Sequence, residues 1–169
     1  MSRLLLLAWL CWLTPVRATP PTFDVEVMAV LSRAGCNQGA CHGNLNGKGG
    51  FKLSLRGENP SWDYTALTRQ AFGRRVDPVR PEESLLLRKA TASAPHEGGR
   101  RFTFDSREYQ ILRDWIAAGA RRESTSPQLI SLQVEPSSIW AVEPQDHVPL
   151  RVRAIWADGR TTDVTNLAA

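Results

Sequence analysis

Two cysteines and a histidine stand close together in the segment Cys36-Asn-Gln-Gly-Ala-Cys41-His42-Gly43. Two thiols can bond covalently to the edge of a porphyrin, and a histidine directly after the second thiol can ligate the porphyrin iron. The usual attachment motif for haem c, C-x-x-C-H, has two residues between the cysteines, whereas this chain has four. The extra residues must loop outward if both sulfurs are to reach the ring, and we expect Gly39 to adopt a positive φ in that loop. The segment predicts one covalently attached haem c.

Two other chemistries fit the same residue types. Cys36 and Cys41 could form a disulfide in an oxidising compartment, and cysteines together with histidines could hold zinc. A structural zinc site usually has four ligands, and the remaining histidines, His96 and His147, do not stand in a zinc-binding motif. A disulfide would give no role to His42. The residues favour haem over a disulfide and a disulfide over zinc, and all three interpretations stay open at this point.

The first 18 residues have the pattern of a secretory signal peptide. A basic start, Met1-Ser2-Arg3, precedes an apolar run from Leu4 to Leu13, and Val16-Arg17-Ala18 forms a small-residue cleavage site. The apolar run is about ten residues long, and crossing a bilayer takes roughly 20. We therefore expect export to the periplasm, the cell surface or the medium, with no integral membrane segment after the signal is removed.

The charge of the chain is modest. It carries 21 Lys and Arg against 17 Asp and Glu, and an exported protein meets little nucleic acid, so we expect no nucleic-acid partner. Most of the basicity comes from the arginine doublets Arg74-Arg75, Arg100-Arg101 and Arg121-Arg122, which solvated surfaces would explain. Arg100 and Arg101 lie near His96 in the sequence, and their forked guanidinium groups could instead bind the haem propionates.

Apolar residues at helical spacing, together with capping residues, predict four helices. They run from Thr22 to Gly35, from Pro60 to Gly73, from Pro81 to Lys89 and from Asp105 to Ala118. Asp105 and Glu108 come close to a capping box for the last helix. We expect the first and last helices to pack across each other, with Trp115 in the core.

Alternating apolar residues predict strands after residue 127. Residues 130–134 and 148–156 alternate, and Asp158-Gly159 has the composition of a hairpin turn into a third strand at 160–165. This spacing is typical of a β-sandwich, which takes about seven strands.

The motifs in the first part of the chain resemble those of the planctomycete-type cytochrome c domain. The resemblance covers roughly residues 22 to 121 and rests on the segments Gly35–Gly43, Gly47–Leu55, Gly73–Arg75, Pro81–Leu87, Pro95–Gly99 and Trp115–Ala120. It implies a small α-helical haem domain in which Cys36 and Cys41 hold the porphyrin and His42 is the proximal iron ligand. The family more often has His-Gly-Gly-Gly where this chain has His96-Glu-Gly-Gly99. Residues Leu129 to Leu167 resemble the first part of a group 2 bacterial Ig-like domain.

The second iron ligand decides the chemistry. Met28 lies on the helix that enters the cysteine segment, and His147 lies beyond the predicted haem domain. His96 follows His42 by 54 positions, in a segment rich in proline and glycine. We expect His42 and His96 to be the two metal ligands, which gives a lower reduction potential than a methionine–histidine pair.

The sequence thus predicts a mainly α fold: a small cytochrome c-like helical domain followed by an incomplete β-sandwich. The predicted parts are a signal peptide (1–18), a haem domain (19–122), a linker (123–127) and a partial Ig-like domain (128–169). The expected function is that of a secreted electron-transfer module of a larger multidomain protein, an electron carrier rather than an enzyme, which meets a redox partner protein. The alternative is an extracellular adhesion or scaffold protein with a Cys36–Cys41 disulfide. Peroxidase chemistry would need an open iron position, in competition with His96.

Overall fold

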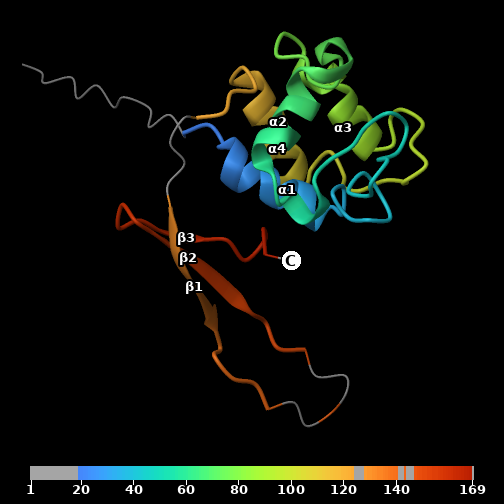
Figure 1. Cartoon of the computed structure of the whole chain (residues 1–169). Helices are drawn as coiled ribbons and strands as arrows, with labels where there is room; N and C mark the ends of the chain where they lie inside the picture. The colour runs from blue at the N-terminus through green and yellow to red at the C-terminus, as the bar shows by residue number, and fades with distance from the viewer. Residues whose placement is uncertain (1–18, 124–127, 141–142, 144–146, 169) are drawn as a thin grey trace, which may run out of the picture.

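A computed structural model describes residues 19–123, 128–140, 143 and 147–168. The described residues up to 123 form a body of short helices, and those from 128 onward form a small antiparallel sheet (Figure 1). The predicted signal peptide, and all of the predicted linker except Glu123, lie outside the described residues.

The helical body has four main helices with tighter turns between them. The first begins as a π-helical segment, η1 (Phe23–Val27), which continues into α1 (Met28–Arg33). The others are α2 (Pro60–Thr68), α3 (Leu85–Ala90) and α4 (Arg107–Ala117), with 3-10 turns η2 (Leu55–Gly57), η3 (Gln70–Gly73) and η4 (Pro81–Glu83) beside them. The four predicted helical regions are confirmed, but the second and third are each divided into a 3-10 turn and an α-helix.

Side-chain caps fix where α2 and α4 begin. The Asn59 side chain accepts a hydrogen bond from the Trp62 N–H at 3.0 Å, and Pro60 occupies the first position of α2. At α4 the Ser106 hydroxyl accepts from the Tyr109 N–H at 3.1 Å. The cap is therefore Ser106 and not the predicted Asp105.

The core of the helical body lies where η1 and α1 meet α4. The Phe23 ring contacts the Trp115 ring at a centroid distance of 5.4 Å and the Tyr64 ring of α2 at 5.1 Å. These contacts confirm that the first and last helices pack together around Trp115. The fully buried apolar side chains of this core are Phe23, Val27, Val30, Leu31, Leu53, Ala66, Leu67, Leu87, Leu112, Trp115 and Ile116.

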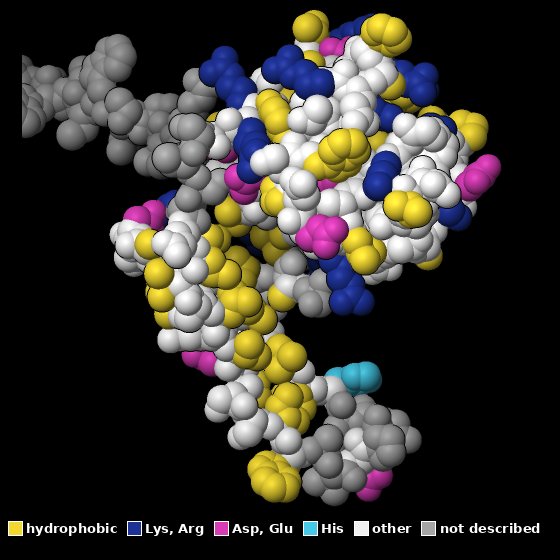
Figure 2. Space-filling view, viewed as in Figure 1, with side chains coloured by type: hydrophobic (Ala, Val, Ile, Leu, Met, Phe, Trp, Pro, Cys, Tyr) yellow, Lys and Arg dark blue, Asp and Glu magenta, His cyan; other side chains and the backbone are white. Residues whose placement is uncertain are grey.

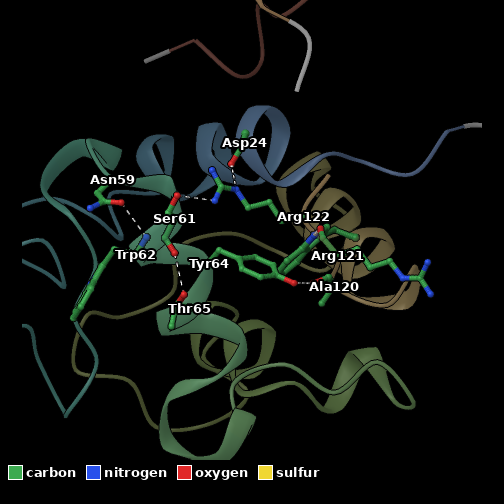
Figure 3. Close-up of polar contacts among 10 residues, drawn as sticks. Asp24, Asn59, Ser61, Trp62, Tyr64, Thr65, Ala120, Arg121 and Arg122 are labelled. Carbon is green, nitrogen blue, oxygen red and sulfur yellow. Dashed lines mark hydrogen bonds and ion pairs between the residues drawn. The ribbon is translucent and has the colours of Figure 1, made fainter. Parts of the chain in front are cut away.

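An ion pair ties the end of the helical body back to its beginning (Figure 3). The Arg122 Nε donates to the Asp24 carboxylate of η1 at 2.7 Å, and its Nη1 donates to the Ser61 hydroxyl of α2 at 2.7 Å. Residues after α4 are therefore held against two helices.

Two backbone carbonyls just before Arg122 serve as acceptors for aromatic side chains. The Tyr64 hydroxyl donates to the Ala120 carbonyl at 3.1 Å (Figure 3), and the Trp115 indole N–H donates to the Arg121 carbonyl at 2.8 Å. The Tyr64 hydroxyl and the Trp115 indole N–H therefore have their hydrogen-bond acceptors in the segment that follows α4.

The sheet consists of β1 (Leu129–Glu135), β2 (Arg151–Trp156) and β3 (Thr161–Asp163), in that order and antiparallel. Leu132 pairs with Ala154, and Ala154 pairs with Thr162, so these three residues share one face. Gly159, with a φ of +83°, makes the turn between β2 and β3, as the Asp158-Gly159 pair predicts.

Burial differs between the edge strand β1 and the central strand β2. Val152, Ala154 and Trp156 of β2 are buried, whereas every residue of β1 is exposed. Hydrophobic side chains gather over the strands in Figure 2, and the exposed ones of β1 are Leu129, Ile130, Leu132 and Val134. The described residues form one sheet and no second sheet that would complete a sandwich. Near its end the chain meets the helical body, since Leu167 packs against the helical core and Arg33 donates to the Ala168 carbonyl at 2.6 Å.

The prediction of a mainly α fold is wrong. Helices make up 33% of the structure and strands 13%, and the strands form the three-stranded sheet. The helices are short because positive-φ residues such as Gly35, Gly57 and Gly73 end or interrupt them. Long segments between helices, such as 34–54, are built of turns. Within the described residues, no helix has both the length and the apolar character needed to cross a membrane.

Candidate cofactor site

The cysteine segment begins where α1 ends. Gly35 has a φ of +74°, and the Cys36 N–H donates to the Leu31 carbonyl at 2.9 Å, which closes the helix. The His42 N–H then donates to the Cys36 carbonyl at 2.9 Å. The residues between the cysteines therefore form a closed loop, with Gln38, Gly39 and Ala40 exposed. The fourth residue between the cysteines, Asn37, is buried, so three of the four residues are exposed.

The glycines in this loop have different roles from those predicted. Gly39 is not among the residues with positive φ, so the prediction for it is wrong. Gly43 is required for a different reason, because a Cβ there would lie 2.0 Å from the Asn37 carbonyl oxygen. Close approach of two backbone segments, and not a positive φ, is what keeps a side chain out of this loop.

Both thiols face the same cavity. Cys36 and Cys41 are free thiols, each partly buried, and both line the cavity. Burial raises the pKa of the Cys36 thiol to about 11, against a smaller lowering by the Arg101 charge. At neutral pH the Cys36 sulfur therefore carries its proton.

His42 and His96 face each other with nearly parallel rings. Their ring centroids are 6.3 Å apart and the ring planes differ by 10°. Both imidazoles line the cavity, His42 from the cysteine segment and His96 from the loop after α3. Two residues that are 54 positions apart in the sequence are thus brought together.

A backbone carbonyl anchors each of the two imidazoles. His42 Nδ1 lies 3.0 Å from the Phe51 carbonyl oxygen, and His96 Nδ1 lies 2.9 Å from the Gly99 carbonyl oxygen. A carbonyl can only accept, so Nδ1 is the donor and a neutral ring has its lone pair on Nε2. Metal-ligating histidines usually have their second nitrogen held in this way. Burial also lowers the pKa of His42, which favours the neutral form that binds metals.

Gly98 and Phe51 fix the positions of the two rings. A Cβ on Gly98 would lie 2.9 Å from the His96 Cε1 atom, so the loop passes close over this ring. The Phe51 ring contacts the His42 ring at a centroid distance of 4.6 Å. Both imidazoles are therefore restrained by packing as well as by hydrogen bonds.

The cavity that these side chains line has a volume of about 760 Å³, within the usual range for ligand sites. Its apolar wall comes from α1, α2 and α3 and from Phe51, with the aliphatic residues Leu31, Leu67, Leu85, Leu86 and Ala90. Its charged residues are Lys48, Arg74, Arg75, Lys89, Arg101 and Glu97. Five cationic side chains against one acid favour an apolar ligand that carries negative charge.

Only one of the two arginines predicted to bind propionates lines the cavity. Arg101 lines the cavity, but its Nε donates to the Ala34 carbonyl at 2.6 Å and its Nη1 to the Gly98 carbonyl at 3.3 Å. Arg100 is exposed and is not part of the cavity wall. Arg75, which was assigned to solvated surface, is buried and lines the cavity. No sequence pattern separates Arg75 from Arg74, because burial depends on packing against distant segments.

Other candidate ligands lie elsewhere. Met28 is buried in the core and is not part of the cavity wall, and His147 is exposed. Among the described residues no group of three or more His, Cys, Asp or Glu side chains is arranged to hold a metal ion.

Comparison with protein-family models, with curated proteins and with solved structures gives no match.

Proposed function

We propose that this chain is an exported electron-transfer module that binds one haem c, through Cys36 and Cys41, with His42 and His96 as the two iron ligands. The observation that carries the proposal is the pair of imidazoles 6.3 Å apart, each held through Nδ1 by a carbonyl. Two imidazoles that share one metal, with each ligating nitrogen about 2 Å from it, have ring centroids roughly 6 Å apart. The observed centroid separation of 6.3 Å is close to that value.

The thiols suit covalent attachment to the edge of a porphyrin. Cys36 and Cys41 lie in the wall of the same cavity as His42, and the Cys36 thiol is protonated at neutral pH. Each thiol would add its S–H across a vinyl group of the ring, which would form the C–S bond and place the thiol hydrogen on the neighbouring carbon, so no oxidant would be consumed. The apolar walls and the excess of cationic side chains fit a flat apolar ring that carries carboxylates.

Electron transfer is the function that this ligand set supports best. When bound, haem supplies a one-electron Fe(III)/Fe(II) couple. His42 and His96 would both ligate the iron and so leave no ligand position for a substrate, which disfavours peroxidase chemistry. The electron would pass to or from a redox partner protein in the compartment to which residues 1–18 direct the chain.

Mass spectrometry and absorption spectra of the exported chain test the proposal. The full chain is produced in a bacterium that has cytochrome c maturation machinery. We expect the mature protein to gain the mass of one haem and to show the spectrum of two-imidazole coordination. His96→Ala should keep the added mass but change the spectrum to that of a single axial histidine, whereas the matched control His147→Ala should leave both unchanged.

Two results would each contradict one part of this proposal. An unmodified mass with Cys36 and Cys41 joined in a disulfide would favour the adhesion or scaffold alternative. A His96→Ala spectrum identical to that of the parent would retain haem binding but exclude His96 as a ligand.

A further inference from the structure

Arg75 is a buried arginine held by backbone carbonyls from three segments. It follows η3 and is 7% exposed. Its Nη1 donates to the Ala66 carbonyl at 2.9 Å and to the Gln70 carbonyl at 3.2 Å, and its Nη2 donates to the Gly50 carbonyl at 2.9 Å. Its guanidinium carbon also lies 4.5 Å from the centroid of the Phe51 ring. These contacts leave the side chain little freedom to move.

The charge of Arg75 is not balanced by an acid. Within the described part of the chain, no Asp or Glu forms an ion pair with it. Burial, and to a smaller extent the Arg74 charge, lowers its pKa, but a guanidinium stays protonated under all ordinary conditions. A buried charge without a counter-charge destabilises the folded chain. Carbonyl dipoles reduce that cost, and a bound anion would reduce it further.

Arg75 keeps hydrogen-bond donors that its three carbonyl partners do not use. A guanidinium has five N–H donors, and the three carbonyls use three of them, which leaves the Nε–H and one Nη2–H without a partner in the described residues. No fully buried side-chain nitrogen or oxygen among the described residues lacks a hydrogen bond. The Nε atom, which has no partner, is therefore not fully buried, and the Arg75 side chain lines the cavity.

The other cavity arginines are less suited to bind an anion. Arg101 donates to the carbonyls of Ala34 and Gly98, so it links the segment before Cys36 to the loop of His96. Arg74 is exposed, and its charge is accessible to solvent. Arg75 alone among these three combines deep burial with a rigid guanidinium.

We propose that Arg75 binds a carboxylate group of the ligand in the cavity and so sets the orientation of that ligand. The inference rests on the proposed function, in which the ligand is a porphyrin with two propionates. It replaces the sequence-based assignment of this role to Arg100 and Arg101. A forked guanidinium with two free donors suits a carboxylate better than a lysine would.

A paired carboxylate should remain ionised across the neutral range. In the parent holoprotein we therefore expect a midpoint potential that is almost independent of pH between about pH 5 and 8. In Arg75→Gln the carboxylate loses its cation, its pKa rises into this range, and the potential should become more positive as the pH falls. Arg100→Gln is the matched control, since it removes the same charge from an exposed side chain outside the cavity wall, and its pH profile should follow that of the parent.

A second measurement covers the case in which Arg75→Gln does not mature. The full chain with Cys36→Ser and Cys41→Ser is titrated with ferric protoporphyrin IX and with its dimethyl ester. A charge-assisted hydrogen bond corresponds to a preference of roughly tenfold or more for the free acid, and Arg75→Lys or Arg75→Gln should reduce that preference.

The outcomes separate this inference from the proposed function. A parent chain that takes up no haem contradicts the proposed function itself. If the parent holds haem but Arg75→Gln leaves both the pH profile and the preference for the free acid unchanged, the role of Arg75 is excluded. The same conclusion follows if Arg101→Gln and not Arg75→Gln produces the two changes.

Discussion

The position at which the helical body ends can be tested by shortening the chain at two nearby residues. One variant ends at Glu123, and so keeps Arg122 and the carbonyls of Ala120 and Arg121. The other ends at Gly119 and lacks all three. Both variants lack the sheet, so the difference between their unfolding free energies measures the contribution of residues 120–123 alone.

The shorter variant should lose about 3 kcal/mol of unfolding free energy relative to the one that ends at Glu123. The indole N–H of Trp115, a residue 1% exposed, loses its acceptor, and a buried donor without a partner costs about 1–3 kcal/mol. The half-buried hydroxyl of Tyr64 also loses its acceptor but can reach water. The Arg122–Asp24 ion pair, with side chains 30% and 20% exposed, contributes about 1 kcal/mol or less. For a domain of this size the total corresponds to a fall in Tm of roughly 10–20 °C.

Urea and thermal unfolding, followed by far-UV circular dichroism, measure the difference, and the Soret band reports retention of haem. The variant that ends at Glu123 should match the full chain within about 1 kcal/mol, because the described contacts that it loses are mostly near the surface. They include the packing of Leu167, the Arg33–Ala168 hydrogen bond and the attraction between Asp163 and Arg107. Equal stability of the two shortened variants would refute the role of the two carbonyls. Loss of the Soret band in the variant that ends at Glu123 would show that the sheet helps to build the site.

Two further predictions concern the sheet and the thiols. The exposed apolar residues of β1 and its unpaired edge favour association, so on size-exclusion chromatography the full chain should self-associate more than the variant that ends at Glu123, and equal association states would exclude this. In protein made without maturation machinery, the Cys36 pKa of about 11 against the ordinary 9.0 means that fewer thiolates form at pH 8. Alkylation of native Cys36 should be about 100-fold slower than in denatured chain and should accelerate as the pH rises toward 11, whereas equal native and denatured rates would contradict the effect of burial.

The sequence predicted those elements that depend on local patterns. The helices that begin near Thr22 and Asp105 could be predicted because apolar periodicity and capping residues are short-range patterns in the sequence. The strands of the sheet could be predicted for the same reason. The predicted fold class failed because the overall balance of helix and strand depends on how many residues stay in turns, and positive-φ positions at non-glycine residues such as Ala71 and Phe72 carry no sequence signal.

The candidate site was predicted in its residue types but not in its geometry. The pairing of His42 with His96 could be proposed because few histidines were available to choose from. The Nδ1 contacts to Phe51 and Gly99 could not, since backbone carbonyls carry no sequence signature. Arg75 was missed for a related reason: its anchors at Gly50, Ala66 and Gln70 come together only in the folded chain.

The cavity also bears on how the helical body becomes stable. A space of about 760 Å³ lies among α1, α2 and α3, where a domain of this size would otherwise pack side chains against one another. A ligand that joins His42 to His96 would act as a cross-link that closes a loop of 54 residues, and in the chain-entropy treatment such a link stabilises a fold by about 4 kcal/mol. The ligand would then be part of the hydrophobic core and a constraint on the unfolded chain at once. Chains that fail to acquire it would be the ones exposed to proteases, so the amount of protein that accumulates would follow the supply of the ligand.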